Sequence, residues 1–342
     1  MRKTAAVSLC LIALVLLAAV PFLWCCACSR QEAGRPAAER APGRLVVVTT
    51  LFPLYDFARS IGGDKAEVSL LLPPGVEPHS FEPKPADLMR IHKADIFVYT
   101  GDFMEPWATV LVKGVGKDGP LIVDSSRGIA LQPQTQGAGE SRIKTGARTG
   151  TGAVPAPEGA HAGAAHSADP HIWLDFGNAQ VMVDNILTAF AARDPANRAF
   201  YEKNALSYKA RLAALDEEFR KGLASCTTRL FVHGGHYAFS YLARRYGLTY
   251  VSVYGLTPDA EPSVSRLAWL VGEMRLSGVK YVFYEELIQP RMAETLASET
   301  GAALLPLNGG HNVTRDQMEK GVTFIAIMES DLKNLRMGLQ CR

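Results

Sequence analysis

Four short motifs each contain a histidine in a place suited to binding a metal ion. The four are His79 in Gly75-Val76-Glu77-Pro78-His79, His171 in Asp169-Pro170-His171-Ile172-Trp173-Leu174, His236 in His233-Gly234-Gly235-His236, and His311 in Asn308-Gly309-Gly310-His311. Imidazole nitrogens suit Zn²⁺, and four of them can complete its tetrahedron at about 2.0–2.1 Å. The acidic oxygen cage that Ca²⁺ needs is missing from these motifs.

Three of the four histidines follow strand-like runs. His79, His236 and His311 each come shortly after such a run, and they belong to both halves of the chain. Ligands of open α/β sheets bind beyond the carboxyl ends of the strands. We therefore expect a metal site between the two halves. His171 follows a long polar segment instead of a strand-like run, so the strand pattern does not place it.

The remaining polar candidates have weaker claims. We expect His92 to lie on a helix surface, His233 to orient His236 rather than bind metal, and His161 and His166 to lie in a loop. Glu285 and Glu286 follow another strand-like run, where they can orient ligands, face solvent or act as a general base. Glu286 or water is the alternative to His311 as the fourth ligand.

Strand-like and helix-like runs alternate along the chain, which predicts parallel sheets flanked by helices. Expected strands cover 45–49, 68–72, 95–100, 121–123, 230–233, 248–254, 279–285 and 303–307. Expected helices cover 53–61, 85–92, 178–192, 196–224, 237–246, 263–276, 291–300 and 314–339. The predicted fold class is α/β, with two lobes that each hold a mostly parallel sheet of about four strands.

A long helix is expected to join the two lobes. Its apolar stripe is expected at Leu206, Leu212, Leu215 and Phe219, and it would be roughly 40 Å long. We place the N-terminal lobe at 44–195, the rigid connecting helix at 196–224 and the C-terminal lobe at 225–342. Residues 132–168 have almost no large apolar side chains, which predicts a disordered surface loop within the first lobe.

The first 43 residues have the pattern of an export signal followed by a tether. Arg2 and Lys3 precede an apolar run over 5–24, and cysteines follow, so we expect residues 1–27 to be a cleaved signal peptide and 28–43 a flexible tether. Cys28, or else Cys26, is the expected site of lipid attachment. The alternative is an uncleaved anchor helix, because the apolar run is long enough to span a bilayer.

Composition narrows the functional classes. The chain has 342 residues, is 48% hydrophobic and 20% charged, and carries a net charge of +2, of which Arg2 and Lys3 supply both units. A nearly neutral mature chain argues against nucleic acid as a partner. Beyond the leader and the lipid-site candidate Cys28, only Cys226 and Cys341 remain, and in an exported chain they predict one disulfide.

Several motifs resemble those of the periplasmic zinc- and manganese-binding proteins of ABC importers. They are Leu51-Phe52-Pro53-Leu54-Tyr55-Asp56, Pro73-Pro74-Gly75-Val76-Glu77-Pro78-His79, Asp169-Pro170-His171-Ile172-Trp173-Leu174-Asp175 and His236-Tyr237-Ala238-Phe239-Ser240-Tyr241-Leu242. The resemblance runs from about residue 45 to the C-terminus. It implies two lobes joined by a stiff helix, metal in the cleft between them, and His79, His171 and His236 as ligands. Manganese-binding relatives often carry Asp near the last strand, where this chain has His311.

The expected function is high-affinity capture of zinc outside the cytoplasmic membrane and delivery to an ABC-type permease. We expect a monomeric lipoprotein, periplasmic or on the cell surface, without catalytic activity. The alternatives are a manganese-binding homologue, a metal-dependent adhesin and a zinc hydrolase. An HExxH helix, which would favour the hydrolase, is not present in the sequence.

Overall fold

The computed structural model describes residues 43–116, 119–133, 168–255, 262–285, 287 and 289–342. The predicted leader and most of the tether lie outside these residues, as do Cys26, Cys28 and residues 134–167 of the predicted loop. Pro133 and Ala168, which flank that loop, form an isolated antiparallel bridge. Among the described helices none is both long and apolar enough to cross a membrane.

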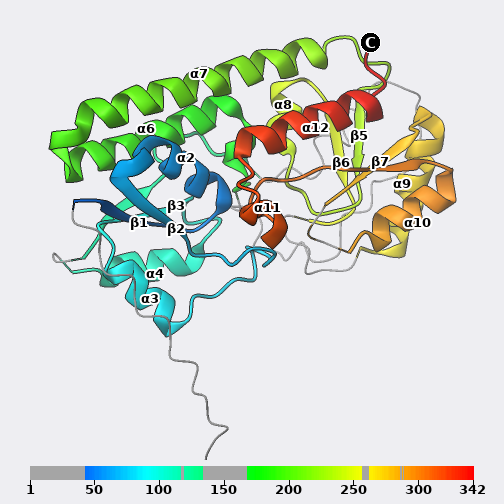
Figure 1. The fold of residues 1–342 in the computed structure, drawn as a ribbon. Helices are drawn as coiled ribbons and strands as arrows, with labels where there is room; N and C mark the ends of the chain where they lie inside the picture. Colours follow the sequence, from blue (N-terminus) through cyan, green and yellow to red (C-terminus); the bar gives the residue numbers. More distant parts are fainter. Residues whose placement is uncertain (1–42, 117–118, 134–167, 256–261, 286, 288) are drawn as a thin grey trace, which may run out of the picture. The chain divides into compact units, whose positions relative to one another are not determined.

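Two four-stranded parallel sheets form the framework, as the sequence predicts (Figure 1). The first contains β1 (Leu45–Thr49), β2 (Ala66–Leu70), β3 (Ile96–Tyr99) and β4 (Leu121–Asp124), in the order β2-β1-β3-β4. The second contains β5 (Leu230–His233), β6 (Thr249–Ser252), β7 (Tyr281–Tyr284) and β8 (Ala303–Pro306), in the order β6-β5-β7-β8. The second sheet therefore repeats the strand order of the first.

Alternation along the strands places helices on both faces of each sheet. In β1, Val47 packs into the central core and Val48 into a separate outer cluster, since successive side chains point to opposite faces. In β5, Phe231 packs into the central core and Val232 into another outer cluster. The central core contains residues of both halves, whereas each outer cluster belongs to one half.

The helices that line the central core run along the same side of both sheets in Figure 1. They are α2 (Phe52–Gly62), α6 (Phe176–Arg193), α7 (Arg198–Gly222), α8 (Ser240–Arg245) and α12 (Phe324–Gly338). The other faces carry α3 (Pro85–His92), α4 (Pro106–Gly114), α9 (Val264–Ser277) and α10 (Arg291–Thr300), and α11 (Arg315–Glu319) precedes α12.

Helix α7 is the long helix that the sequence predicts between the two sheets. It packs against α2 and α6 of the first half and against α12 of the second (Figure 1). Its 25 residues span about 37 Å. The buried stripe is Tyr201, Ala205, Tyr208, Leu212, Leu215, Asp216 and Phe219. Leu206 is 71% exposed, so its predicted place in the stripe is wrong: it lies one residue, about 100° around the helix, from Ala205.

Two further predictions about helices are wrong in extent, and α4 was not predicted. The segment expected to be helical over 237–246 forms α8 only from Ser240. The backbone amides before it bond elsewhere: that of Tyr237 donates to Gly255 O (2.6 Å), and that of Ala238 donates to the Tyr250 hydroxyl (3.2 Å). The single helix expected over 314–339 is two helices. Gly321, with φ of 68°, lies in the left-handed region between them.

Candidate metal centre

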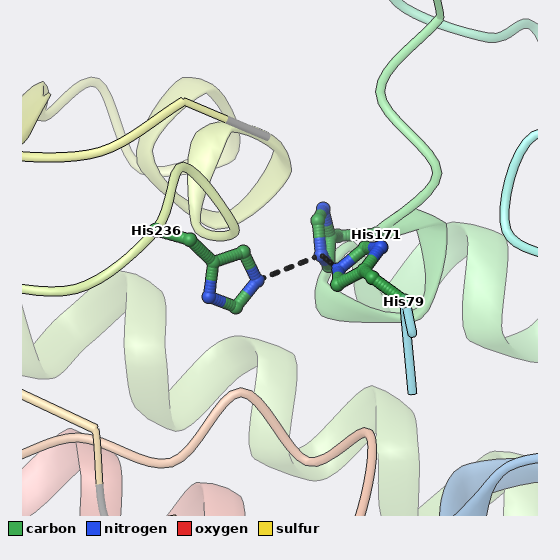
Figure 2. Close-up of side chains that lie close together, drawn as sticks. All are labelled: His79, His171 and His236. Carbon is green, nitrogen blue, oxygen red and sulfur yellow. Dashed lines mark hydrogen bonds between the residues drawn. The ribbon is translucent and has the colours of Figure 1, made fainter. Parts of the chain in front are cut away.

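Three of the four predicted histidines converge on one point, as Figure 2 shows. One ring nitrogen from each of His79, His171 and His236 lies within 4.8 Å of the others. The Nε2 atoms of His171 and His236 are 3.1 Å apart, and those of His171 and His79 are 3.3 Å apart. Two nitrogens bound at about 2.05 Å to a tetrahedral zinc ion would be about 3.3 Å apart. The rings therefore already have the spacing of ligands around one ion.

The three histidines come from different elements. His79 lies in the loop between β2 and α3, His171 directly precedes the short 3₁₀ helix Ile172–Leu174, and His236 lies between β5 and α8. Two positions thus follow the carboxyl ends of strands, as the sequence predicts. His171 and His236 are fully buried and His79 is partly buried. The cluster is assembled from both halves of the chain.

Asp169 orients the ring of His171. Its Oδ1 accepts hydrogen bonds from the backbone amide of His171 (3.0 Å) and from His171 Nδ1 (2.8 Å). With the proton held on Nδ1, the lone pair of Nε2 points toward the cluster. The sequence analysis did not single out Asp169, although a carboxylate two residues before a candidate ligand is a usable signal.

Glu285, directly after the end of β7, orients the ring of His236. Its Oε1 accepts from the backbone amide of His236 (2.8 Å) and from His236 Nδ1 (2.7 Å). Glu285 follows β7, and the carboxylate reaches His236 over Gly235, where a Cβ atom would lie 2.0 Å from Oε1. A side chain at that position would therefore displace the carboxylate. Of the roles predicted for Glu285, the observed one is orientation of a histidine.

His311 lies beside the cluster but is not one of the three converging residues. Its ring centroid is 5.6 Å from that of His236, and the side chain is 4% exposed. Its Nδ1 is buried without a hydrogen-bond partner in the described part of the chain. The turn that carries it is fixed by Gly310, with φ of 69°, and by a hydrogen bond from Trp173 Nε1 to Gly309 O (2.7 Å).

The segment after His311 holds the loop that carries His79. Asn312 is fully buried, and its Nδ2 donates to Pro73 O (2.9 Å) and Val76 O (2.7 Å). The amide of Gly75 donates to Val313 O (2.9 Å). The positions of His79 and His311 are therefore linked through backbone carbonyls, a relation that the sequence analysis did not reveal.

Burial favours neutral rings at three of the four histidines. Burial, reinforced by the neighbouring histidines, lowers the pKa of His79 well below its usual value and that of His311 to about 3. Burial also lowers the pKa of His171, although Asp169 opposes the shift. For His236 burial acts in the same direction, but the Glu285 carboxylate outweighs it and raises the pKa. Neutral imidazole is the form that binds a metal.

Two of the other candidates, His92 and His233, are described by the structure and are not among the three converging residues. His92 is exposed on α3, as predicted. His233 is fully buried behind His236, where its Nδ1 donates to His236 O (3.2 Å), which fits the predicted orienting role. Glu286, His161 and His166 lie outside the residues that the structure describes.

Comparisons with known proteins agree with this arrangement. The family model described as zinc-uptake complex component A, periplasmic (ZnuA), matches residues 47–338. The high-affinity zinc uptake system protein ZnuA of Bacillus subtilis is 35% identical over 318 residues, which cover 93% of this chain and 94% of the relative. The zinc-binding lipoprotein AdcA of Streptococcus pneumoniae is 34% identical over 94% of this chain, but the match spans only 60% of AdcA.

Solved structures show the same fold. The Zn(II)-bound ZnuA-like domain of S. pneumoniae AdcA has a TM-score of 0.70 and 33% identity, covering 87% of this chain and 99% of that domain. The laminin-binding protein Lmb of Streptococcus agalactiae, described as both adhesin and metal transporter, has a TM-score of 0.72 and 26% identity over 86% of this chain and 99% of its own. The histidine cluster, the repeated parallel sheets and the family match over 47–338 together show that this chain belongs to the ZnuA family of periplasmic zinc-uptake components.

Proposed function

We propose that this protein captures one zinc ion outside the cytoplasmic membrane with His79, His171, His236 and His311 and delivers it to the permease of an ABC importer. The observation that carries the proposal is the convergence of three Nε2 atoms at 3.1 and 3.3 Å, the separation expected around a tetrahedral ion. His311, whose ring packs against His236, is the proposed fourth ligand.

The cluster suits capture rather than catalysis. Four imidazoles would leave zinc without an open coordination position, which a hydrolytic zinc site needs for its water. Asp169 and Glu285 are both engaged with ligand histidines. We therefore assign no enzymatic activity. Because the ligands come from both halves of the chain, separating the segments that carry them would release the ion.

The same nitrogen-rich set bears on the choice of metal. Imidazole suits zinc, whereas manganese is better served by carboxylate oxygen. His311 occupies the position at which an oxygen ligand would favour manganese, so we propose a preference for zinc. Burial lowers the pKa values of His79, His171 and His311, which favours the neutral, metal-binding form of these rings, whereas Glu285 raises the pKa of His236.

The location of the protein follows from its family and from its N-terminus. Members of the family act outside the cytoplasm, and we propose that this chain is exported by residues 1–27, lipidated on Cys28 (or Cys26) and tethered by residues 28–43. The boundaries of the lobes at 44–195 and 225–342, and the monomeric state, are likewise our proposals.

Elemental analysis of protein purified without added metal, followed by competitive titration with zinc and manganese, tests the function. We expect about one zinc per chain and displacement of manganese by zinc. A variant with His79, His171 and His236 all changed to Ala should bind no zinc at this site. His92→Ala, which removes a histidine away from the cluster, is the control and should bind zinc like the wild type. Retention of zinc by the triple variant would contradict the proposed site.

Adhesion is a second candidate because the neighbour Lmb is described as both adhesin and metal transporter. The readout is binding of the purified protein to immobilised laminin with zinc and with a chelator. Laminin binding that requires zinc and is abolished in the triple histidine variant would support the second role. Zinc uptake without any laminin binding would leave only the first.

A further inference from the structure

We propose that Ser240 is a positioning residue for zinc capture, acting through Asp169 on the ring of His171. The inference rests on the proposed zinc site and adds a residue from the opposite half of the chain to it. Ser240 is the first residue of α8, four positions after His236.

A continuous hydrogen-bonded relay joins Ser240 to His171. The Ser240 hydroxyl donates to Asp169 Oδ2, and the other carboxylate oxygen, Oδ1, accepts from His171 Nδ1 at 2.8 Å. Asp169 is 1% exposed and His171 is fully buried, so water does not readily replace either partner. Oδ1 has two donors, the amide and Nδ1 of His171, and Oδ2 has the Ser240 hydroxyl, so donors on both oxygens fix the plane of the carboxylate.

Two other residues of α8 hold the same segment by different atoms. The Tyr241 hydroxyl donates to the backbone carbonyl of Asp169 (3.1 Å), and Arg245 Nη1 donates to Asp175 Oδ1 (2.7 Å). The first contact holds the backbone before His171 and the second holds a side chain after it, and neither touches the carboxylate of Asp169. Only the Ser240 hydroxyl among these three acts on the group that orients the ring.

The expected consequence of losing the hydroxyl is therefore local. Without Ser240 the carboxylate keeps its bonds to the amide and Nδ1 of His171 but can turn about its Cβ–Cγ bond. The Nδ1–H···O bond is then less well aligned, and Nε2 is held less firmly toward the ion. Outer partners of ligand histidines typically change metal affinity by about 10–100-fold. For a residue one bond further out we expect about 3–10-fold.

The test measures zinc dissociation from the purified full-length exported protein into excess chelator, together with the absorption spectrum of the Co²⁺ form. We expect Ser240→Ala to release zinc about 3–10 times faster and to alter the Co²⁺ ligand-field bands. Ser240→Thr, which keeps the hydroxyl, should have the zinc release rate and the Co²⁺ spectrum of the wild type. Ser298→Ala removes an exposed hydroxyl that donates to Thr295 O on α10 and should match the wild type.

A double-mutant cycle separates positioning from general support of the fold. If Ser240 acts through Asp169, Ser240→Ala should have no further effect on the release rate in an Asp169→Ala background. An equal effect in both backgrounds, or a release rate of Ser240→Ala equal to wild type, would overturn the inference. Should Asp169→Ala fail to fold, the Co²⁺ spectrum of Ser240→Ala decides, since unchanged bands also overturn it. Absence of zinc binding by the wild type would instead refute the proposed function.

Discussion

Replacement of His311 by Ala is the perturbation that most directly tests the composition of the metal site. His311 is 4% exposed, packs against His236 and has a pKa lowered by burial to about 3. At pH 7 its ring is therefore neutral before zinc arrives. Zinc therefore displaces no proton from His311 when it binds. The whole effect of His311→Ala on zinc affinity should then come from the loss of the ligand.

The magnitude follows from the proposed ligand count. Structural zinc sites with four protein ligands are worth about 10–16 kcal/mol, or about 2.5–4 kcal/mol per ligand. Water can enter the vacated position and recover part of this. We expect His311→Ala to lose about 1.4–2.7 kcal/mol, which is about 10–100-fold in affinity. His311→Asp should recover part of the affinity and shift the preference toward manganese, because carboxylate oxygen suits the harder ion.

The assay is competition for zinc against a chromophoric chelator, repeated with manganese, and the matched control is His92→Ala on the exposed face of α3. Thermal unfolding of the metal-free variants separates loss of a ligand from loss of fold. Zinc affinity of His311→Ala equal to wild type would remove His311 from the site. A comparable loss in Glu286→Ala would then identify the carboxylate as the fourth ligand.

Three further outcomes are expected. Glu285 raises the pKa of His236, whereas burial lowers the pKa values of His79, His171 and His311. On acidification His236 should therefore be the first of the four to take up a proton, and zinc affinity should fall by about tenfold per pH unit below the pKa of His236. A zinc affinity that does not change between pH 7 and pH 5 would refute this. The Cys226–Cys341 disulfide closes a separation of 115 residues, so Cys226→Ala/Cys341→Ala should lower the free energy of unfolding by on the order of 4–5 kcal/mol in denaturant titration, and two free thiols in the unreduced protein would contradict the pairing. Since Pro133 and Ala168 already pair, replacing residues 134–167 by a short Gly-Ser linker should leave the melting temperature within a degree or two, and a larger drop would mean that the segment packs against the fold.

Much of the framework could be predicted from local pattern. The helix-like run over 291–300 was sufficient for α10, which has the predicted bounds Arg291–Thr300 and ends at Gly301 in the left-handed region. Errors arose where tertiary contacts override local preference. The amides of Tyr237 and Ala238 bond to Gly255 and Tyr250 rather than only along a helix, which shortens α8. The exposed Leu206 shows that hydrophobicity alone does not settle which face of α7 is buried.

The sequence by itself determined which residue types could bind zinc and that they follow strands in both halves, because those signals depend on neighbours along the chain. Only the tertiary structure decided which nitrogens converge and what orients them. Glu285 reaches His236 across 49 residues, and Ser240 reaches Asp169 across 71. Hydrogen bonds between residues so far apart leave no periodic trace in the sequence. The first depends on the pairing of β7 with β5 in one sheet, and the second on how the two halves of the chain pack together.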